Sequence, residues 1–405
     1  MTAANSKNEE EERSAKRECP VCGGVTVKLL FHQSFELLAG ATVVEGYDVV
    51  VCSRCGAGYA DGIPPQSVFD AYYRDMSKYD EGDRRGEPDS AEERRFHDIA
   101  AVVERFIPGK NSRIFEIGCA SGGLLSAIRR AGFPNVLGSD PSPACIRTAL
   151  DVYGVPGIVG TIFTVPTPAI SFDFLILTGV MEHIRDLDSC IAQFHQLLGS
   201  SGRVYLEVPD ASRYQWNADA PFQEFSVEHI NFFSRTSLTN LMETRGFRVL
   251  DAGNAMRPQH EVSCPCAYAV FEQANRSSAW KRDAETEPGL RAYIQGCRAE
   301  DDRIRSTIRQ KLRAGERMIV WGVGTHTLRL LANGGLDPAT IALFVDSNPK
   351  YQGRQLRGIP IVSPEELGER IEPILISSRG FQREILHLIQ RRLARRNPVI
   401  LLYES

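Results

Sequence analysis

The sequence predicts an α/β protein with doubly wound, largely parallel sheets, and three observations lead to this prediction. An apolar stretch at 114–117 runs into a glycine-containing turn at 118–122 and then into a helix. From there to about residue 209, short apolar stretches alternate with segments of helical periodicity, which is typical of parallel strands joined by crossover helices. A second run of the same kind begins at 318.

The chain has 405 residues, more than a single hydrophobic core usually supports, so several domains are expected. Residues 1–17 are charged and lack periodicity, and we expect a disordered tail there. We predict a small cysteine-containing module at 18–75, a first α/β domain at 76–280 and a second α/β domain at 281–405.

Charge and hydropathy limit the partners of the protein. A net charge of -4 argues against binding to a phosphate backbone, which would require a basic surface. The N-terminus is polar, and no apolar run approaches the roughly 20 residues that span a bilayer. We therefore expect a cytoplasmic monomer that acts on a small molecule and binds neither nucleic acid nor membranes.

The first chemical feature is a pair of C-x-x-C motifs, Cys19/Cys22 and Cys52/Cys55. Each motif places two thiols on one turn, and cysteines of a cytosolic chain are better interpreted as thiols or metal ligands than as disulfides. Four such sulfurs form a closed tetrahedral Zn²⁺ site that stabilises a small module. A catalytic zinc would need an open coordination position, so we predict a structural one.

The turn after the first strand is the second feature. Gly118 and Gly122 lie four residues apart and Glu116 precedes them, whereas a dinucleotide fold spaces its glycines as Gly-x-Gly-x-x-Gly. Glu116 stands in an otherwise apolar strand, where an unpaired carboxylate costs several kcal/mol. A cationic or NH-rich cofactor, or the amides of the turn, would offset that cost. The pattern resembles motif I of class I S-adenosylmethionine (SAM) methyltransferases.

Asp140 follows Gly118 by 22 residues and ends the next predicted strand. There it could accept hydrogen bonds from both ribose hydroxyls of an adenosine. The alternative is that it caps the helix beginning near 141. Together with residues at the same ends of the strands, the candidate cofactor-binding set is Glu116, Gly118, Cys119, Gly122, Asp140, Pro141 and Thr178.

Two histidines are candidates for acid–base chemistry. His183 follows the strand predicted at 172–177, at the end of the sheet where ligands bind, although it could simply cap or pack the next helix. His229 lies in a segment rich in aromatic and polar residues, at 222–234, and could remove a proton from a nucleophile. Glu228 or Glu224 could orient it, unless the pair is purely structural.

The second α/β run has glycines at 322 and 324, but its third glycine position is occupied by Thr327. A side chain there would crowd the helix against the strand, so we do not expect a full dinucleotide site.

The order of these features resembles the three-domain, zinc-containing sugar C-methyltransferases, which combine an N-terminal zinc module, a class I SAM methyltransferase domain and a C-terminal Rossmann-like domain. The resemblance covers 19 to about 400 and includes the stretch at 346–361. It implies an enzyme that uses SAM and Zn²⁺ to methylate the carbon beside the keto group of a nucleotide-linked deoxysugar.

Within that resemblance, His229 would abstract the α-proton and the resulting enolate would attack the methyl group of SAM. Glu228, His183 and Tyr79 would be the active-site neighbours of His229. Close relatives place a tyrosine two residues before the glutamate, where this chain has Ser226.

Two alternatives stand beside this hypothesis. An O- or N-methyltransferase acting on a glycan or natural-product intermediate would use His229 to deprotonate a different atom. A non-catalytic zinc-ribbon binding protein with a vestigial cofactor fold would bind no cofactor at all.

Overall fold

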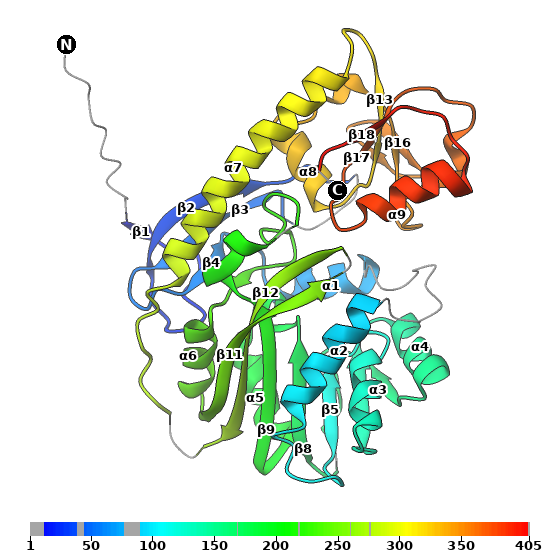
Figure 1. Ribbon diagram of the computed structural model, residues 1–405. Coiled ribbons are helices and arrows are strands. Elements are labelled where there is room, and N and C mark those ends of the chain that lie inside the picture. Colours follow the sequence, from blue (N-terminus) through cyan, green and yellow to red (C-terminus); the bar gives the residue numbers. More distant parts are fainter. Residues whose placement is uncertain are drawn as a thin grey trace, which may run out of the picture.

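The computed structural model describes residues 12–38, 44–76, 90–167, 169–217, 219–259, 261–274 and 277–403. Its strands form three sheets, and Figure 1 shows the N-terminal sheet beside α7, the central sheet below it and the C-terminal sheet above. The central and C-terminal sheets are the α/β units expected from the sequence, so the predicted fold class is confirmed.

The N-terminal sheet is antiparallel, with strand order β1-β2-β3-β4-β10. Its strands are β1 (Glu12–Ser14), β2 (Thr26–Ser34), β3 (Gly46–Cys52), β4 (Gly58–Asp61) and β10 (Asn231–Phe232). Two boundaries differ from the sequence-based prediction. Residues 12–14 pair with β2 instead of belonging to a disordered tail, because their amides and carbonyls complete the sheet edge. The strand β10 lies in the sequence predicted for the first α/β domain, at 76–280, but it pairs with β4 of the N-terminal sheet.

The central sheet has the order β11-β12-β9-β8-β5-β6-β7. The pairs from β9 to β7 are parallel, and β12 and β11 extend the sheet as an antiparallel hairpin. Its strands are β5 (Ile114–Ile117), β6 (Val136–Asp140), β7 (Gly157–Val159), β8 (Phe172–Thr178), β9 (Leu198–Pro209), β11 (Phe247–Gln259) and β12 (Val262–Gln273).

Helices cover both faces of this sheet because successive side chains of its strands point in opposite directions. Ile114 packs in the cluster that includes α2, α3 and α4, whereas Phe115 packs with α5 and α6. Figure 1 shows α2, α3 and α4 together in front of the sheet. The helices are α1 (Gln66–Met76), α2 (Ser90–Val103), α3 (Gly123–Arg130), α4 (Pro143–Tyr153), α5 (Leu187–Leu197) and α6 (Arg235–Glu243), with 3₁₀ turns η1 (Met181–His183) and η2 (Ala211–Trp216).

The C-terminal sheet has the order β15-β16-β14-β13-β17-β18, with only the β15–β16 pair antiparallel. Its strands are β13 (Met318–Trp321), β14 (Ile341–Val345), β15 (Gln355–Leu356), β16 (Ile359–Val362), β17 (Ile374–Ile376) and β18 (Val399–Leu401). Around it lie α8 (Thr325–Ala332), α9 (Gln382–His387), the 3₁₀ turns η3 (Pro338–Thr340) and η4 (Pro364–Leu367), and the π-helical turn η5 (Leu388–Arg392).

The long helix α7 (Thr286–Lys311) joins the three parts. It runs past the N-terminal sheet to the C-terminal domain (Figure 1). Along its length it contacts η2, which follows β9 of the central sheet. At Gly289 the approach is so close that an added Cβ would overlap the backbone of Ser212. At its other end, Asp301 forms a buried two-point ion pair with Arg329 of α8, at 2.6 and 2.7 Å.

Thr327 of α8 is buried, and its hydroxyl donates to the carbonyl of Gly322 and to Ser377 Oγ, 2.8 Å away. Asp346 after β14 accepts from the amides of Val323 and Asn348 at 2.7 and 2.8 Å. Both carboxylate oxygens of Asp346 are therefore hydrogen-bonded to backbone amides of the loops that follow β13 and β14.

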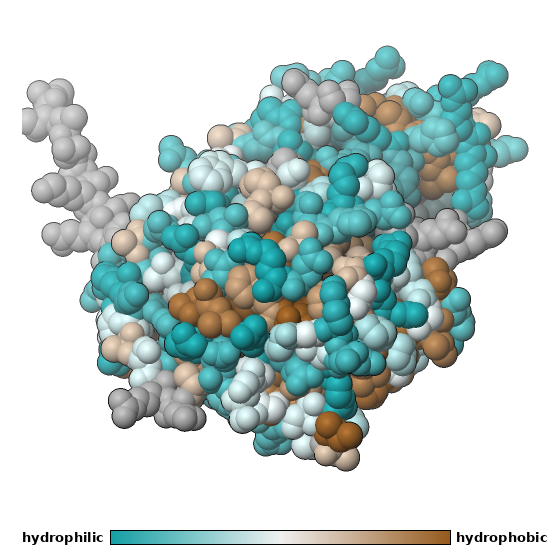
Figure 2. Space-filling model, turned by 60° about the horizontal axis from the view of Figure 1, so that its bottom comes forward, coloured by the Kyte–Doolittle hydropathy of each residue, from teal (hydrophilic) through white to brown (hydrophobic). Residues whose placement is uncertain are grey.

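The surface is mixed. Figure 2 shows hydrophilic residues over most of one face, with hydrophobic residues in separate patches. In the part of the chain that the structure describes, no helix combines the length and apolar character needed to cross a bilayer.

Candidate active site

The turn after β5 is shaped by close packing. Gly118 has φ 76°, and a Cβ on it would lie 2.6 Å from Val180 Cγ2. Only glycine combines that left-handed conformation with the absence of a side chain. The turn therefore lies directly against the loop that leads into η1, and the candidate cofactor turn and His183 are neighbours in space.

Asp140, at the end of β6, holds this turn in place. Its Oδ2 accepts from the amide of Ala120 at 3.0 Å, and its Oδ1 accepts from the amide of Ser142 at 2.9 Å. The N-cap of α4 is Ser142, whose hydroxyl accepts from the amide of Cys145. Asp140 therefore does not cap the helix itself, and its carboxylate lies between the two loops of the predicted adenosine site.

Glu116 is 2% exposed in the middle of β5. Burial raises its pKa to about 8, although the charge of Arg95 on α2 acts in the opposite direction. Within the described residues, its Oε2 has no hydrogen-bond partner. A buried acceptor of this kind fits a donor group supplied by a cofactor.

The remaining candidate cofactor residues take different positions. The thiol of Cys119 points into the core, since a Cβ on Gly138 would lie 2.5 Å from its sulfur. Cys119 can therefore meet a ligand only through its backbone. Pro141 and Thr178 are half-buried at the ends of β6 and β8.

The two candidate histidines lie side by side. Their ring centroids are 4.9 Å apart with the rings nearly perpendicular, at 68°. His183 belongs to η1, and His229 comes from the segment before β10. Because β10 pairs with the N-terminal sheet, His229 lies beside His183, close to the end of β8.

A hydrogen bond defines the tautomer of one of the two rings. His183 Nδ1 lies 3.0 Å from the carbonyl oxygen of Glu228, which can only accept, so this nitrogen is the donor and the Nε2 of the neutral ring carries the lone pair. His229 Nδ1 lies 3.3 Å from Glu224 Oε2, close enough for an ion pair when the ring is protonated.

The carboxylate beside His229 is Glu224, not Glu228. The side chain of Glu228 is buried and its Oε1 accepts from the hydroxyl of Tyr72 at 2.9 Å. The chain bends at 227–228, and the side chains of Glu228 and His229 have different partners. Tyr79, the other predicted neighbour of His229, lies outside the described residues.

Glu182 is a site residue that the sequence analysis did not select. It is 2% exposed, and burial raises its pKa to about 7, with the charge of His229 acting in the opposite direction. Its Oε1 lies 3.8 Å from His183 Nε2. Potential ligand atoms of Glu182, His183 and His229 all lie within 4.8 Å of one another, so these groups could also hold a cation. The available signal was an acid in the loop that follows a buried strand.

The segment that carries His229 is held from several sides. Ser226 Oγ accepts from the amides of Glu228 and His229, at 3.2 and 3.1 Å. Tyr47 on β3 donates to the carbonyl of Ser226 at 2.8 Å. The serine that replaces the expected tyrosine therefore has a structural role in shaping this loop.

The helix α7 supplies further support. Tyr293 accepts from the amide of Glu224 at 3.1 Å, and the sulfur of Cys297 accepts from the amide of Phe222 at the same distance. Arg329 of α8 lies over the Phe222 ring, 4.9 Å from its centroid. The C-terminal part of the chain thus positions the carboxylate beside His229.

The four cysteines of the C-x-x-C motifs meet at one point. The sulfurs of Cys19 and Cys55 are 3.6 Å apart, as are those of Cys22 and Cys52. A tetrahedral zinc with bonds of about 2.3 Å places its sulfurs about 3.8 Å apart. The thiol arrangement therefore fits the metal that the motif spacing predicts.

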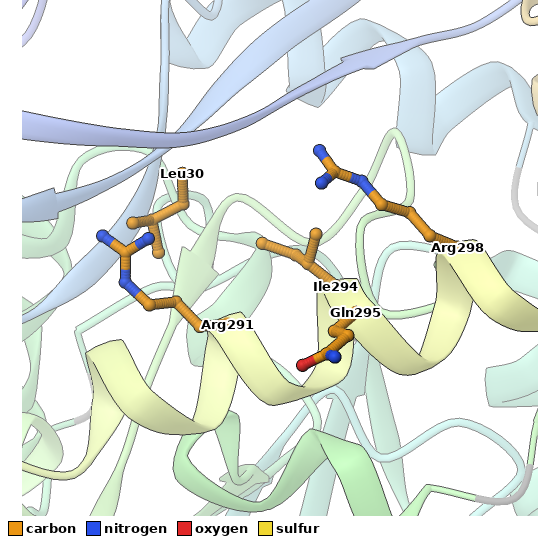
Figure 3. Close-up of a pocket in the computed structure, with 5 residues that line it drawn as sticks. All are labelled: Leu30, Arg291, Ile294, Gln295 and Arg298. Carbon is orange, nitrogen blue, oxygen red and sulfur yellow. The ribbon is translucent and has the colours of Figure 1, made fainter. Parts of the chain in front are cut away.

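Figure 3 shows a hollow of about 200 Å³ between β2 and α7, lined by Leu30, Arg291, Ile294, Gln295 and Arg298. None of these residues belongs to the glycine turn or to the histidine pair. This hollow does not mark the candidate active site.

Known proteins resemble both α/β domains. A family described as a methyltransferase domain matches residues 91–252, and a family described as a C-methyltransferase C-terminal domain matches residues 276–397. The C-methyltransferase NovU of Streptomyces niveus is 27% identical over 349 residues, which are 81% of this chain and 79% of that protein.

Two further likenesses are more limited. A probable S-adenosylmethionine-dependent methyltransferase of Mycolicibacterium smegmatis is 26% identical over 142 residues, covering 34% of this chain and 52% of that protein. The solved 1,6-didemethyltoxoflavin-N1-methyltransferase of Burkholderia thailandensis is 16% identical, with a TM-score of 0.41, over 55% of this chain and 97% of that chain.

The two family matches follow one another along the chain in the order that the fold shows. They exclude the alternative of a non-catalytic zinc-ribbon protein. The comparisons show a SAM-dependent methyltransferase whose two α/β domains match, in this order, a methyltransferase domain and a C-methyltransferase C-terminal domain.

Proposed function

We propose that the protein methylates a carbon next to the keto group of a nucleotide-linked deoxysugar, with His229 as the base. The observation that carries the proposal is the histidine pair beside the candidate cofactor turn, with Glu224 Oε2 3.3 Å from His229 Nδ1. The C-methyltransferase C-terminal domain and the likeness to NovU support transfer to carbon.

Transfer to carbon needs a nucleophile that the substrate does not offer at neutral pH. His229 Nε2 takes the α-proton, and the electron pair of the broken C–H bond moves into an enolate. SAM, held at the turn after β5, would supply the electrophilic methyl group that the enolate carbon attacks, and the sulfur would keep the electron pair of the broken bond. Glu224 stabilises the imidazolium that forms, because its carboxylate faces Nδ1.

The cofactor would bind at the turn after β5. Glu116 would accept a hydrogen bond from it, and Asp140 would meet its ribose, while Gly118 keeps the backbone open. His183 would face the substrate beside His229, with Glu182 behind it as a carboxyl group able to gain or lose a proton near neutral pH.

We also propose that Cys19, Cys22, Cys52 and Cys55 bind one structural Zn²⁺. Four thiolates close the coordination shell, so this ion would take no part in methyl transfer.

Deuterium exchange tests the base. The full-length protein is incubated in D₂O with S-adenosylhomocysteine and thymidine-diphosphate-linked 4-keto-deoxysugars, and exchange at the α-carbons is followed by NMR. We expect exchange with the wild type, a loss of about 10²–10⁴-fold in His229→Ala, and no change in His387→Ala, an exposed histidine on α9.

The same samples with SAM locate the transferred methyl. A methyl on oxygen or nitrogen without carbon exchange would establish the O- or N-methyltransferase alternative. Exchange that persists at the wild-type rate in His229→Ala would exclude this residue as the base.

A further inference from the structure

A pocket of about 610 Å³ lies between the zinc module and the loop that follows η1. It is distinct from the hollow in Figure 3 and contains none of the candidate catalytic side chains. Among its lining residues are Arg17 from the N-terminal module, Gln66 of α1, and Arg185 and Arg245 from the central domain.

Arg17 is 6% exposed, and its guanidinium has an incomplete set of partners. Its Nη2 donates to Asn231 Oδ1 at 2.6 Å, while its Nε and Nη1 are buried without a hydrogen-bond partner among the described residues. The nearby carboxylate of Asp61 accepts from the backbone amide of Arg17 and forms its ion pair with Arg13. Unsatisfied buried donors on a charged group are costly unless a ligand meets them.

Arg185 presents a second guanidinium. Its Nε is also buried without a partner within the described ranges. Arg185 and Arg17 line the same pocket, where one anion could contact both groups. Three acids also line the pocket. Asp186 accepts from Ser189, Asp188 pairs with Arg245 at 2.6 Å, and the exposed Glu18 forms no ion pair among the described residues.

We propose that this pocket binds a phosphate-bearing ligand through Arg17 and Arg185. Guanidinium groups match phosphate oxygens with paired N–H donors, and the volume of the pocket admits a diphosphate. The inference is independent of the methylated atom and of the role of His229.

The pocket is connected to the candidate active site. Asn231, which receives the hydrogen bond of Arg17, donates through Nδ2 to the carbonyls of Met181 and Ile184, at 3.0 and 2.7 Å. These two carbonyls flank the segment that carries Glu182 and His183. A ligand bound to Arg17 would therefore be connected, through Asn231, to the backbone that positions His183.

Calorimetric titration of the zinc-replete, full-length protein with inorganic diphosphate tests the proposal. We expect saturable one-to-one binding that weakens at least about tenfold in both Arg17→Gln and Arg185→Gln. Arg147→Gln, an exposed arginine on α4 outside the pocket, should bind like the wild type. Zinc content and thermal unfolding without ligand verify that each variant is folded.

A second titration, with thymidine diphosphate in the presence of saturating inorganic diphosphate, distinguishes the sources of the ligand. Competition identifies the diphosphate of a nucleotide, and independent binding identifies a separate polyphosphate ligand. Equal diphosphate affinity in the wild type and in folded Arg185→Gln would overturn the proposal, as would the absence of binding to the wild type. In that case Arg17 would serve only as a counter-charge to the cysteine thiolates.

Discussion

At the scale of single residues, the candidate site is governed by which buried polar groups have partners. His183 Nδ1 donates to the carbonyl of Glu228, and His229 Nδ1 lies beside Glu224. Each of two buried glutamates, Glu116 and Glu182, has an oxygen without a hydrogen-bond partner among the described residues. A buried polar group without a partner lowers the stability of the protein without ligand. A ligand that supplies the missing hydrogen bond removes this cost.

Glu116→Gln should reveal this cost. Because burial raises the pKa of Glu116 to about 8 from its ordinary 4.5, its contribution to stability is complete below about pH 4.5 and is lost as the pH rises through 8. Without cofactor, the variant should therefore gain stability relative to the wild type between those pH values, by at most about 1.4 kcal/mol per pH unit.

The measurement is chemical denaturation from pH 5 to 9, with Glu104→Gln, an exposed glutamate, as the control. Binding of S-adenosylhomocysteine should weaken in Glu116→Gln alone. Parallel stability profiles for the wild type and Glu116→Gln would contradict this account.

Glu224→Gln should slow α-carbon exchange less than His229→Ala does, and it should move the acid limb of the pH–rate profile to lower pH. Loss of the carboxylate beside Nδ1 makes the imidazolium less stable. Glu228→Gln is the matched comparison, since its side chain bonds to Tyr72. An unshifted profile in Glu224→Gln together with a shifted one in Glu228→Gln would reverse the two assignments.

At the scale of elements, the N-terminal sheet and the histidine segment form one structure. β10 closes the sheet next to β4, and it begins two residues after His229. The cysteine cluster lies at the ends of the strands of the same sheet. The cysteine cluster and the segment that carries His229 are therefore linked through this sheet, although none of the four cysteines belongs to the candidate active site.

Cys52→Ser should lose bound zinc and unfold at a lower temperature, and its methyl transfer should fall because β10 is no longer held. Metal content by atomic absorption and thermal unfolding, each with and without a chelator, provide the test. Cys264→Ser changes a buried thiol on β12 far from the cluster and should keep one zinc per chain. A fully active Cys52→Ser protein would disprove the linkage.

At the scale of the whole molecule, α7 connects the domains and supports the loop at 222–229 through Tyr293 and Cys297. Gly289 permits this contact because the backbone of Ser212 occupies the space of a Cβ. The C-terminal domain thus has a positioning role that needs no ligand of its own.

Gly289→Ala should destabilise the protein by about 1–3 kcal/mol and slow methyl transfer, because the helix must move away from η2. Gly296→Ala lies on the same helix with open space at its Cβ and should be neutral or stabilising by up to about 1 kcal/mol. Denaturant unfolding and initial rates compare the pair. Equal effects of the two substitutions would show that the contact with η2 is unimportant.

Local sequence determined the strand, turn and helix order, the cysteine spacing and the set of groups around Glu116 and Asp140, because periodicity, glycine placement and short-range motifs express themselves over a few residues. The same patterns predicted His183 and His229 as candidate site residues, and the two rings lie next to each other in the structure.

Only the tertiary structure decided which carboxylate faces His229, that Glu182 lies buried behind His183, that residues 12–14 form a strand, and that Arg17 meets Arg185 across a pocket. Arg17 and Arg185 are separated by a long stretch of chain. Glu182 and Glu224 are close in sequence to the histidines they face, but their orientation depends on the joining of β10 to the N-terminal sheet and on the packing of α7 on η2. Such contacts depend on the packing of whole elements, which no local pattern encodes.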